Sequence, residues 1–167
     1  FFVDCVLSVA VRTPELQWVI KLHPCEGSDA WGSQLDAHGL TEIRVFTSNL
    51  HKLLFCCDVL LSWFSTTILE ACIFSKPVIA LRVPGCWTPD DYIADGLAIG
   101  VDDARELGEK LEMLLRDADA RDQFIAKGKS VLDDYCHRPD GKASERVGEL
   151  VARLTGAREL PGAANCV

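Results

Sequence analysis

The 167-residue sequence has little positive charge. It contains 17 lysine and arginine residues against 25 aspartate and glutamate residues, which gives a formal net charge of -8. A chain of this charge repels a phosphate backbone and offers no basic stripe for counterion release. The composition therefore disfavours nucleic acid as a partner. Any phosphate that binds must be held by a local structural feature such as a helix N-terminus.

The sequence also lacks a hydrophobic run long enough to cross a membrane. A spanning helix needs about 20 apolar residues, and the longest candidate, residues 53–73, is interrupted by Asp58 and Glu70. The chain opens on Phe1 without a methionine or a basic leader segment. We therefore expect a cytoplasmic protein. Because 49% of the residues are hydrophobic and 25% are charged, we expect one folded domain rather than disorder.

Several motifs of nucleotide binding and catalysis are absent. The chain contains neither G-x-G-x-x-G nor G-x-x-x-x-G-K-[ST], which excludes the usual NAD site and the Walker loop of ATP hydrolysis. It has no G-x-S-x-G, so a hydrolase elbow is unsupported. Its eight cysteines are scattered and include no C-x-x-C pair. We expect buried, reduced thiols, with no metal and no organic cofactor.

Short apolar runs alternate with helical patterns along the chain. This alternation is typical of β-α-β units and predicts an α/β fold, a Rossmann-like parallel sheet with helices on both faces and a helical C-terminal extension. Residues 1–155 form the expected domain, and residues 156–167 a flexible tail. Strands are expected at 17–22, 42–46, 59–62, 78–81 and 97–101, and helices at 2–11, up to Leu35, 49–57, 65–75, 104–116, 118–135 and 140–154.

Three consecutive hydroxyl residues follow the third predicted strand. In a parallel sheet the ligand lies beyond the carboxyl ends of the strands, and Ser65, Thr66 and Thr67 open a helix at such a place. Their hydroxyls and the free N–H groups of the helix start suit a phosphate. Helix capping is the alternative, although a cap needs one hydroxyl and not three. Glu70, one turn further on, could accept hydrogen bonds from a sugar or could simply be solvated.

Other candidate side chains follow the neighbouring strands. His23 comes directly after the first strand and before Pro24, where it could donate to a phosphate or act as an acid, or be structural. Arg82 follows the fourth strand and could bind a pyrophosphate, or pair with Asp90 or Asp91. Ser48 follows the second strand and offers an N-cap to the helix at residues 49–57.

Four segments together resemble the C-terminal half of GT-B glycosyltransferases, most closely those of capsule and surface polysaccharide synthesis. UDP-N-acetylglucosamine 2-epimerases share that fold. The segments occur in the family's order and extend the resemblance to about Leu154. They are V-I-K-L-H-P at residues 19–24, C-D-V-L-L-S at 57–62 leading into S-T-T-I-L-E-A at 65–71, K-P-V-I at 76–79 and D-G-K-A-S-E-R at 140–146.

The resemblance implies a donor-binding domain for a nucleotide sugar, UDP- or CMP-linked. In such enzymes this domain faces an N-terminal domain that holds the acceptor and usually the catalytic base. The resemblance implies phosphate contacts from His23 and from residues 65–67, with Glu70 near the ribose or sugar hydroxyls. The nucleobase would lie near Thr47 and Ser48.

Two departures from the family pattern affect the expectation. The epimerases carry Ser-Gly-Gly where this chain has Ser65, Thr66 and Thr67, and an acidic arginine motif where it has R-V-P-G at residues 82–85; both favour a transferase. The family domain also begins with a strand that this sequence does not show. We therefore expect a fragment without its first strand and acceptor domain, which binds a ligand but does not turn it over alone.

The sequence thus supports a glycosyltransferase domain that binds a nucleotide sugar for transfer to a polysaccharide or lipid-linked acceptor. The catalytic base is expected in the N-terminal domain, and His23 is the one candidate within this chain. Contact with the inner membrane face would belong to that other domain. The alternatives are an epimerase or hydrolase on the same fold, and a non-catalytic interaction domain in which residues 65–67 are ordinary caps.

Overall fold

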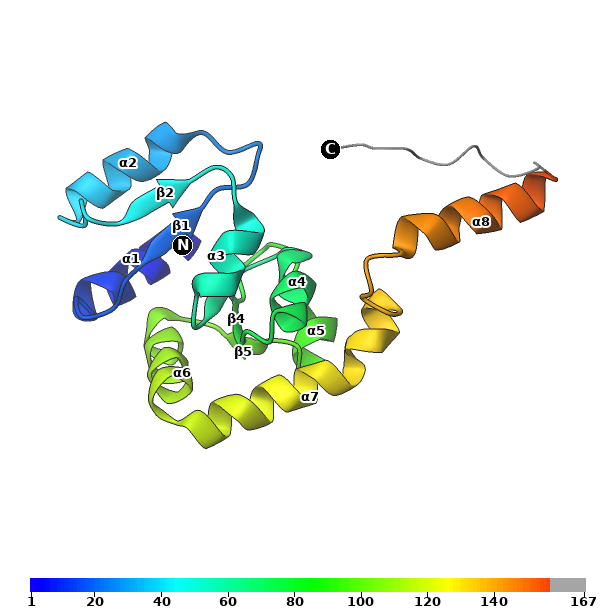
Figure 1. The fold of residues 1–167 in the computed structure, drawn as a ribbon. Coiled ribbons are helices and arrows are strands. Elements are labelled where there is room, and N and C mark those ends of the chain that lie inside the picture. The colour runs from blue at the N-terminus through cyan, green and yellow to red at the C-terminus, as the bar shows by residue number, and fades with distance from the viewer. Residues whose placement is uncertain (157–167) are drawn as a thin grey trace. The chain divides into compact units, whose positions relative to one another are not determined.

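Strands and helices alternate along the chain as far as Val101, after which the described chain is mainly helical (Figure 1). The computed structural model describes residues 1–156, with the side chains of residues 28–30 excepted. The predicted tail therefore lies almost wholly outside the described residues. The elements are α1 (Phe2–Arg12), β1 (Val19–Lys21), α2 (Ser28–Ala37), β2 (Arg44–Phe46), α3 (Leu50–Cys56), β3 (Leu60–Ser62), α4 (Thr67–Ile73), β4 (Val78–Leu81), α5 (Asp90–Ala94), β5 (Ile99–Val101), α6 (Ala104–Arg116), α7 (Ala118–Cys136) and α8 (Ala143–Thr155).

The described strands form two parallel sheets. In the smaller sheet β1 pairs with β2, and Ile20 lies opposite Val45. In the larger sheet β4 lies between β3 and β5, with Ile79 opposite both Leu61 and Ile99. Every strand lies inside its predicted range, and each pairing is parallel as the alternation of strands and helices required. The α/β class with parallel strands is therefore confirmed.

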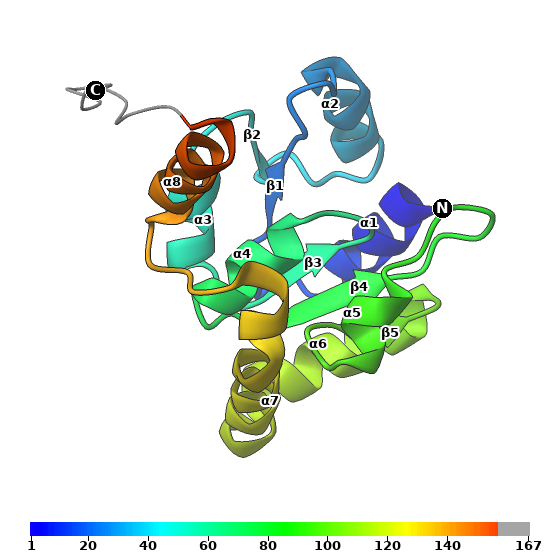
Figure 2. The same cartoon turned by 90° about the vertical axis from the view of Figure 1, so that its right-hand side faces the viewer.

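The larger sheet carries the deepest part of the core. All four residues of β4 are fully buried, because its side chains, which alternate between the two faces, are covered by helices on both sides. Ile79 and Leu81 face a cluster formed by α1 and α6. The helix α4 contacts β3 and β4, and Figure 2 shows α4 and α6 on opposite sides of this sheet.

The smaller sheet is covered on one face by α1 and α2. Leu7 and Ala10 of α1 and Leu35 of α2 are buried in a cluster that includes Ile20 and Val45. Other α1 residues, Cys5 and Val9, belong to the cluster of the larger sheet. The helix α1 is thus shared by the two sheets.

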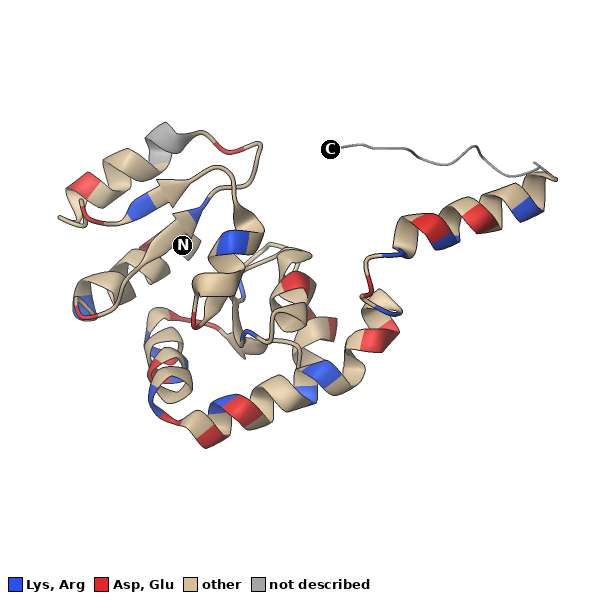
Figure 3. Ribbon diagram, viewed as in Figure 1, with Lys and Arg blue, Asp and Glu red and all other residues tan. Residues whose placement is uncertain are grey.

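The helix α6 shows how local sequence fixes an element. Asp103 is its N-cap and accepts a hydrogen bond from the amide of Glu106 at 2.8 Å. The Glu106 side chain in turn accepts from the amide of Asp102 at 3.0 Å. Such reciprocal bonds satisfy amides that the first turn leaves without partners. Both acidic and basic residues occur along α6 and α7 (Figure 3).

The chain divides into two compact units, Phe1–Leu132 and Asp133–Val167. The second unit begins in the last turn of α7 and includes α8. Arg146 fixes the turn between these helices, because it donates to both carboxylate oxygens of Asp140 at 2.8 Å and to the carbonyl of Arg138 at 3.1 Å. These bonds lower the pKa of Asp140 below its usual range. The motif at residues 140–146 therefore has a local structural role.

Two local predictions were wrong. The short helix α5 was expected to be part of a loop, because Pro84, Gly85 and Pro89 dominate the composition of that segment. Ser48 is not the cap of α3. Asn49 occupies the N-cap position with φ 63°. The Ser48 hydroxyl instead accepts a hydrogen bond from the side-chain amide nitrogen of Asn49 at 3.1 Å.

Candidate functional site

The loop between β3 and α4 carries the three predicted hydroxyl residues. Ser65 and Thr67 are brought together: the Ser65 hydroxyl donates to the Thr67 hydroxyl at 2.8 Å and accepts from the Thr67 amide at 3.1 Å. Thr66 lies between them, is exposed, and occupies the N-cap position without a capping bond from its own side chain. Ser65 therefore satisfies one free amide at the start of α4.

Glu70 is paired with a histidine that the sequence analysis did not single out. The His51 Nε2 atom lies 2.8 Å from a carboxylate oxygen of Glu70. His51 is on α3 and Glu70 on α4, so the contact ties together the helices that follow β2 and β3. The Glu70 side chain is about one-third exposed, and that of His51 about three-quarters. Nineteen positions separate the two in sequence, and no local pattern predicts their meeting.

His23 is exposed in the turn that follows β1. Its Nδ1 atom lies 3.2 Å from the Cys25 amide nitrogen and accepts a hydrogen bond from it. An accepting Nδ1 places the proton of the neutral ring on Nε2. Its backbone amide donates to the Glu26 carboxylate at 2.6 Å. The turn thus holds an imidazole whose Nε2–H is a donor, as a phosphate contact requires.

Arg82 is held by two carboxylates from different elements. Its Nε donates to Asp90 at 3.3 Å, and its Nη1 to Asp102 at 3.3 Å. Gly100 makes room for this guanidinium, because a Cβ there would lie 2.6 Å from one of its nitrogens. The predicted pairing of Arg82 with Asp90 is therefore confirmed. Its second carboxylate partner is Asp102, not Asp91.

Asp90 also accepts a short hydrogen bond from the Thr88 hydroxyl. This bond, with a smaller contribution from Arg82, holds the pKa of Asp90 below its usual range. The carboxylate is therefore kept ionised beside Arg82, and together they fix the loop that follows β4.

Exposed aromatic residues lie on the loops that follow β3 and β4. Phe64 and Trp87 make an edge-to-face contact with their ring centroids 4.5 Å apart, and Trp63 contacts Phe2 in the same geometry at 5.6 Å. Phe64 is 55% exposed and Trp87 is 59% exposed. Their position on the loops after β3 and β4 could have been foreseen from the crevice rule.

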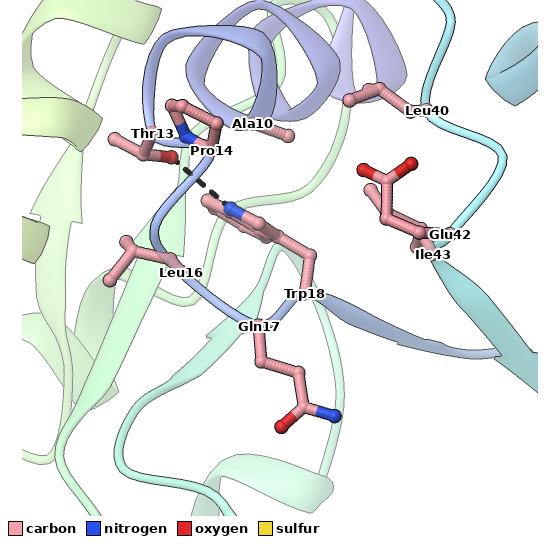
Figure 4. Close-up of a pocket in the computed structure, with 9 residues that line it drawn as sticks. All are labelled: Ala10, Thr13, Pro14, Leu16, Gln17, Trp18, Leu40, Glu42 and Ile43. Carbon is pink, nitrogen blue, oxygen red and sulfur yellow. Dashed lines mark hydrogen bonds between the residues drawn. The ribbon is translucent and has the colours of Figure 1, made fainter.

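A small pocket and a larger groove lie away from these loops. A small pocket of about 70 Å³ is lined by residues at the end of α1 and just before β1 and β2 (Figure 4). The Trp18 indole donates to the Thr13 hydroxyl at its wall, at 3.2 Å. A groove of about 470 Å³ lies between α1 and α6. Neither hollow contains His23, Thr67, Glu70 or another predicted donor-site residue.

The structure describes seven of the eight cysteines. Cys5 and Cys72 are buried, whereas Cys25, Cys56 and Cys86 are exposed, so the expectation of burial was wrong for these three. Burial raises the pKa of Cys57. Within the described residues no group of three or more histidine, cysteine, aspartate or glutamate side chains is placed to hold a metal ion. In the same part of the chain, no helix combines the length and apolar character that a membrane crossing requires.

No protein-family model and no curated protein matches this sequence. Solved structures do match it. The crystal structure of Anabaena Alr3699/HepE in complex with UDP-glucose matches with a TM-score of 0.65 at 13% identity, over 93% of this chain and 45% of its own. The structure of WaaG, a glycosyltransferase involved in lipopolysaccharide biosynthesis, matches with a TM-score of 0.60 at 17% identity, over 89% and 43%.

These similarities establish the fold. The chain is an α/β protein that matches one half of the GT-B glycosyltransferase fold, and it spans less than half the length of both structures. The resemblance drawn from the sequence is therefore confirmed at the level of the fold.

Proposed function

We propose that this chain is the nucleotide-sugar-binding domain of a glycosyltransferase. The observation that carries the proposal is the match of 93% of the chain to part of a protein solved with UDP-glucose. A second support is independent of that match: polar side chains follow the carboxyl ends of β1, β3 and β4, the place where parallel α/β sheets bind their ligands.

The proposed site binds the diphosphate of the donor. Thr66 and Thr67 supply hydroxyl donors, and His23 supplies its Nε2–H. Arg82 would approach the phosphates with its guanidinium held by Asp90 and Asp102. Donors of this kind stabilise the charge that develops on the leaving phosphate during transfer. Glu70 would accept hydrogen bonds from ribose or sugar hydroxyls through the carboxylate oxygen that does not face His51. Thr47 and Ser48, both exposed, would lie near the nucleobase.

Calorimetric titration with UDP, CMP and GDP tests this proposal. We expect one nucleotide to bind, and we expect Thr67→Ala and His23→Ala to weaken it about tenfold each, the effect of losing a hydrogen bond to a charged group. Thr41→Ala and His38→Ala are matched controls, because both residues are exposed and lie before β2, at the amino end of the strands. Absence of binding by any nucleotide to the folded chain would contradict the proposal.

A further inference from the structure

The carboxylate of Glu70 is held by a side chain from another helix. The Nε2 atom of His51, on α3, lies 2.8 Å from the Oε2 atom of Glu70, on α4. An ionised carboxylate only accepts hydrogen bonds, so the proton in this contact is on Nε2. The bond engages Oε2 and leaves the other carboxylate oxygen, Oε1, available to other donors.

The His51 imidazole is itself held in place. It contacts the Phe74 ring, with the ring centroids 6.0 Å apart and the ring planes at 30°. Phe74 follows Glu70 by four positions at the end of α4, a spacing that places both residues on one side of the helix. The two helices are anchored beneath this contact, because Leu54 of α3 and Ile68 of α4 are buried. Two contacts with α4 thus fix an imidazole that is largely exposed.

The contact joins two segments of the proposed donor site. His51 lies three positions after Ser48, which is proposed to lie near the nucleobase. Glu70 lies three positions after Thr67, a proposed hydroxyl donor to the phosphates. Three helical residues rise about 4.5 Å, so Glu70 is within one turn of Thr67. Because the ribose joins the base to the phosphates, a carboxylate that belongs to one of these helices and bonds to the other is suited to meet the ribose hydroxyls.

The bond matters more for geometry than for stability. An exposed pair of this kind contributes little to the free energy of unfolding. A glutamate side chain, however, has several rotatable bonds and loses rotamer freedom when it binds a ligand. A carboxylate that is already held by His51 loses less of this freedom, so it binds hydroxyl groups more tightly.

We propose that His51 is a positioning residue for Glu70. It holds the carboxylate so that Oε1 accepts hydrogen bonds from the ribose, and the pair thereby selects a ribonucleotide over its 2′-deoxy form. A site built to hydrogen-bond a hydroxyl group discriminates against an analogue that lacks the group. The selection of ribose rests on the proposed function, whereas the positioning of Glu70 by His51 does not.

Three-bond scalar couplings of the Glu70 side chain, measured by NMR without nucleotide, test the positioning. A side chain in one staggered rotamer gives distinct couplings, and exchange among rotamers averages them. We expect one rotamer in the unchanged chain and in His51→Gln, whose side-chain amide can replace Nε2 as the donor. We expect averaged couplings in His51→Leu. Lys52→Leu is the matched control, because Lys52 is the next residue of α3 and is also exposed; it should keep the single rotamer.

Averaged couplings in the unchanged chain, or a single rotamer in His51→Leu, would overturn the proposal. This readout uses no nucleotide, so its failure is distinct from failure of the proposed function.

Calorimetric titration of the same variants with UDP, CMP and GDP, and with the 2′-deoxy form of each, tests the selection of ribose. The unchanged chain should prefer the ribonucleotide about tenfold, the effect of one hydrogen bond to a charged group. His51→Gln and Lys52→Leu should retain this preference, and His51→Leu should reduce it to less than about threefold. The same preference in all four chains would overturn the selection of ribose while nucleotide binding itself stands. Absence of binding by all three ribonucleotides would contradict the proposed function, and the couplings would still decide whether His51 positions Glu70.

Discussion

The two sheets of this molecule differ in how much of their surface is buried. In the larger sheet β4 is paired on both sides and fully buried, whereas the smaller sheet has two short strands that are exposed or half-buried throughout. Yet side chains suited to a phosphate follow strands of both sheets, His23 in the smaller one and residues 65–67 in the larger one. The buried residues and the candidate site residues are therefore distributed differently. The larger sheet contributes the most deeply buried strand, whereas the candidate site residues follow strands of both sheets.

The two sheets should differ most in how much an alanine substitution lowers the free energy of unfolding. Ile79→Ala removes a fully buried side chain of β4 and should lower the free energy of unfolding by about 3 kcal/mol, since the cavity adds to the lost burial. Ile20→Ala in β1 should cost about 1 kcal/mol, because that side chain is half-buried. Urea denaturation followed by circular dichroism measures both. Equal losses would mean that the sheets share one core of uniform depth.

Thiol labelling compares the two sheets on a second property. Cys25 is exposed in the turn after β1, whereas Cys72 is buried on α4 and donates to the Leu97 carbonyl at 3.5 Å. A buried thiol reacts only after local opening, so maleimide should modify Cys25 at least about a hundredfold faster than Cys72. Mass spectrometry of peptides gives both rates. Similar rates would contradict the burial of Cys72 beside the larger sheet.

A smaller effect is expected at the two loops that carry hydroxyls. Ser65→Ala removes the acceptor of the Thr67 amide and should lower the free energy of unfolding by about 1 kcal/mol, the usual cost of losing a side-chain hydrogen bond to an amide at a helix start. Ser48→Ala after β2 should change it by less than about 0.5 kcal/mol, because Ser48 is exposed and caps nothing. The same urea titration measures both variants. A Ser48 effect as large as that of Ser65 would contradict the different roles assigned to the two hydroxyls.

The smallest effect concerns the loop after β4. Thr88→Val removes the main cause of the low pKa of Asp90, which should rise toward its ordinary value. A carboxylate whose pKa is lower in the folded state stabilises the protein at pH values above its unfolded pKa, which is about 3.9 for aspartate. This stabilisation is lost as the pH falls through the folded-state pKa. The variant should lose that contribution. NMR titration of the carboxyl carbons measures the pKa, with Asp140, held by Arg146, as the unchanged control. An unchanged pKa of Asp90 would exclude Thr88 as its cause.

Most of the fold could be predicted from the sequence because its elements are separated by clear signals. Apolar β-branched runs ended at Pro24, Ser62 and Arg82, and the parallel pairing followed from their alternation with helices. The exception, α5, is only five residues long and follows Pro89. A helix that short is stabilised by its surroundings rather than by its own sequence.

The candidate site was predictable in its position but not in its internal contacts. The crevice rule selected the loops that hold His23, Thr67 and Arg82. The partners of those loops come from distant positions: His51 reaches Glu70 from another helix, and Asp102 reaches Arg82 from the end of β5. Such contacts depend on how helices and strands pack in three dimensions. No local pattern in a single sequence predicts that packing. The roles of these residues in donor binding stay predictions.

The central claim, that a nucleotide binds at the carboxyl ends of the strands, is tested most directly by titrating the ¹⁵N-labelled chain with UDP and with CMP. The amide signals of His23, Thr66 and Thr67 should shift in a saturable manner with one of the two nucleotides. The indole N–H of Trp18, bonded to Thr13 at the opposite end of the strands, should stay unchanged. Saturable shifts centred on Trp18, or no shifts with either nucleotide, would contradict the claim.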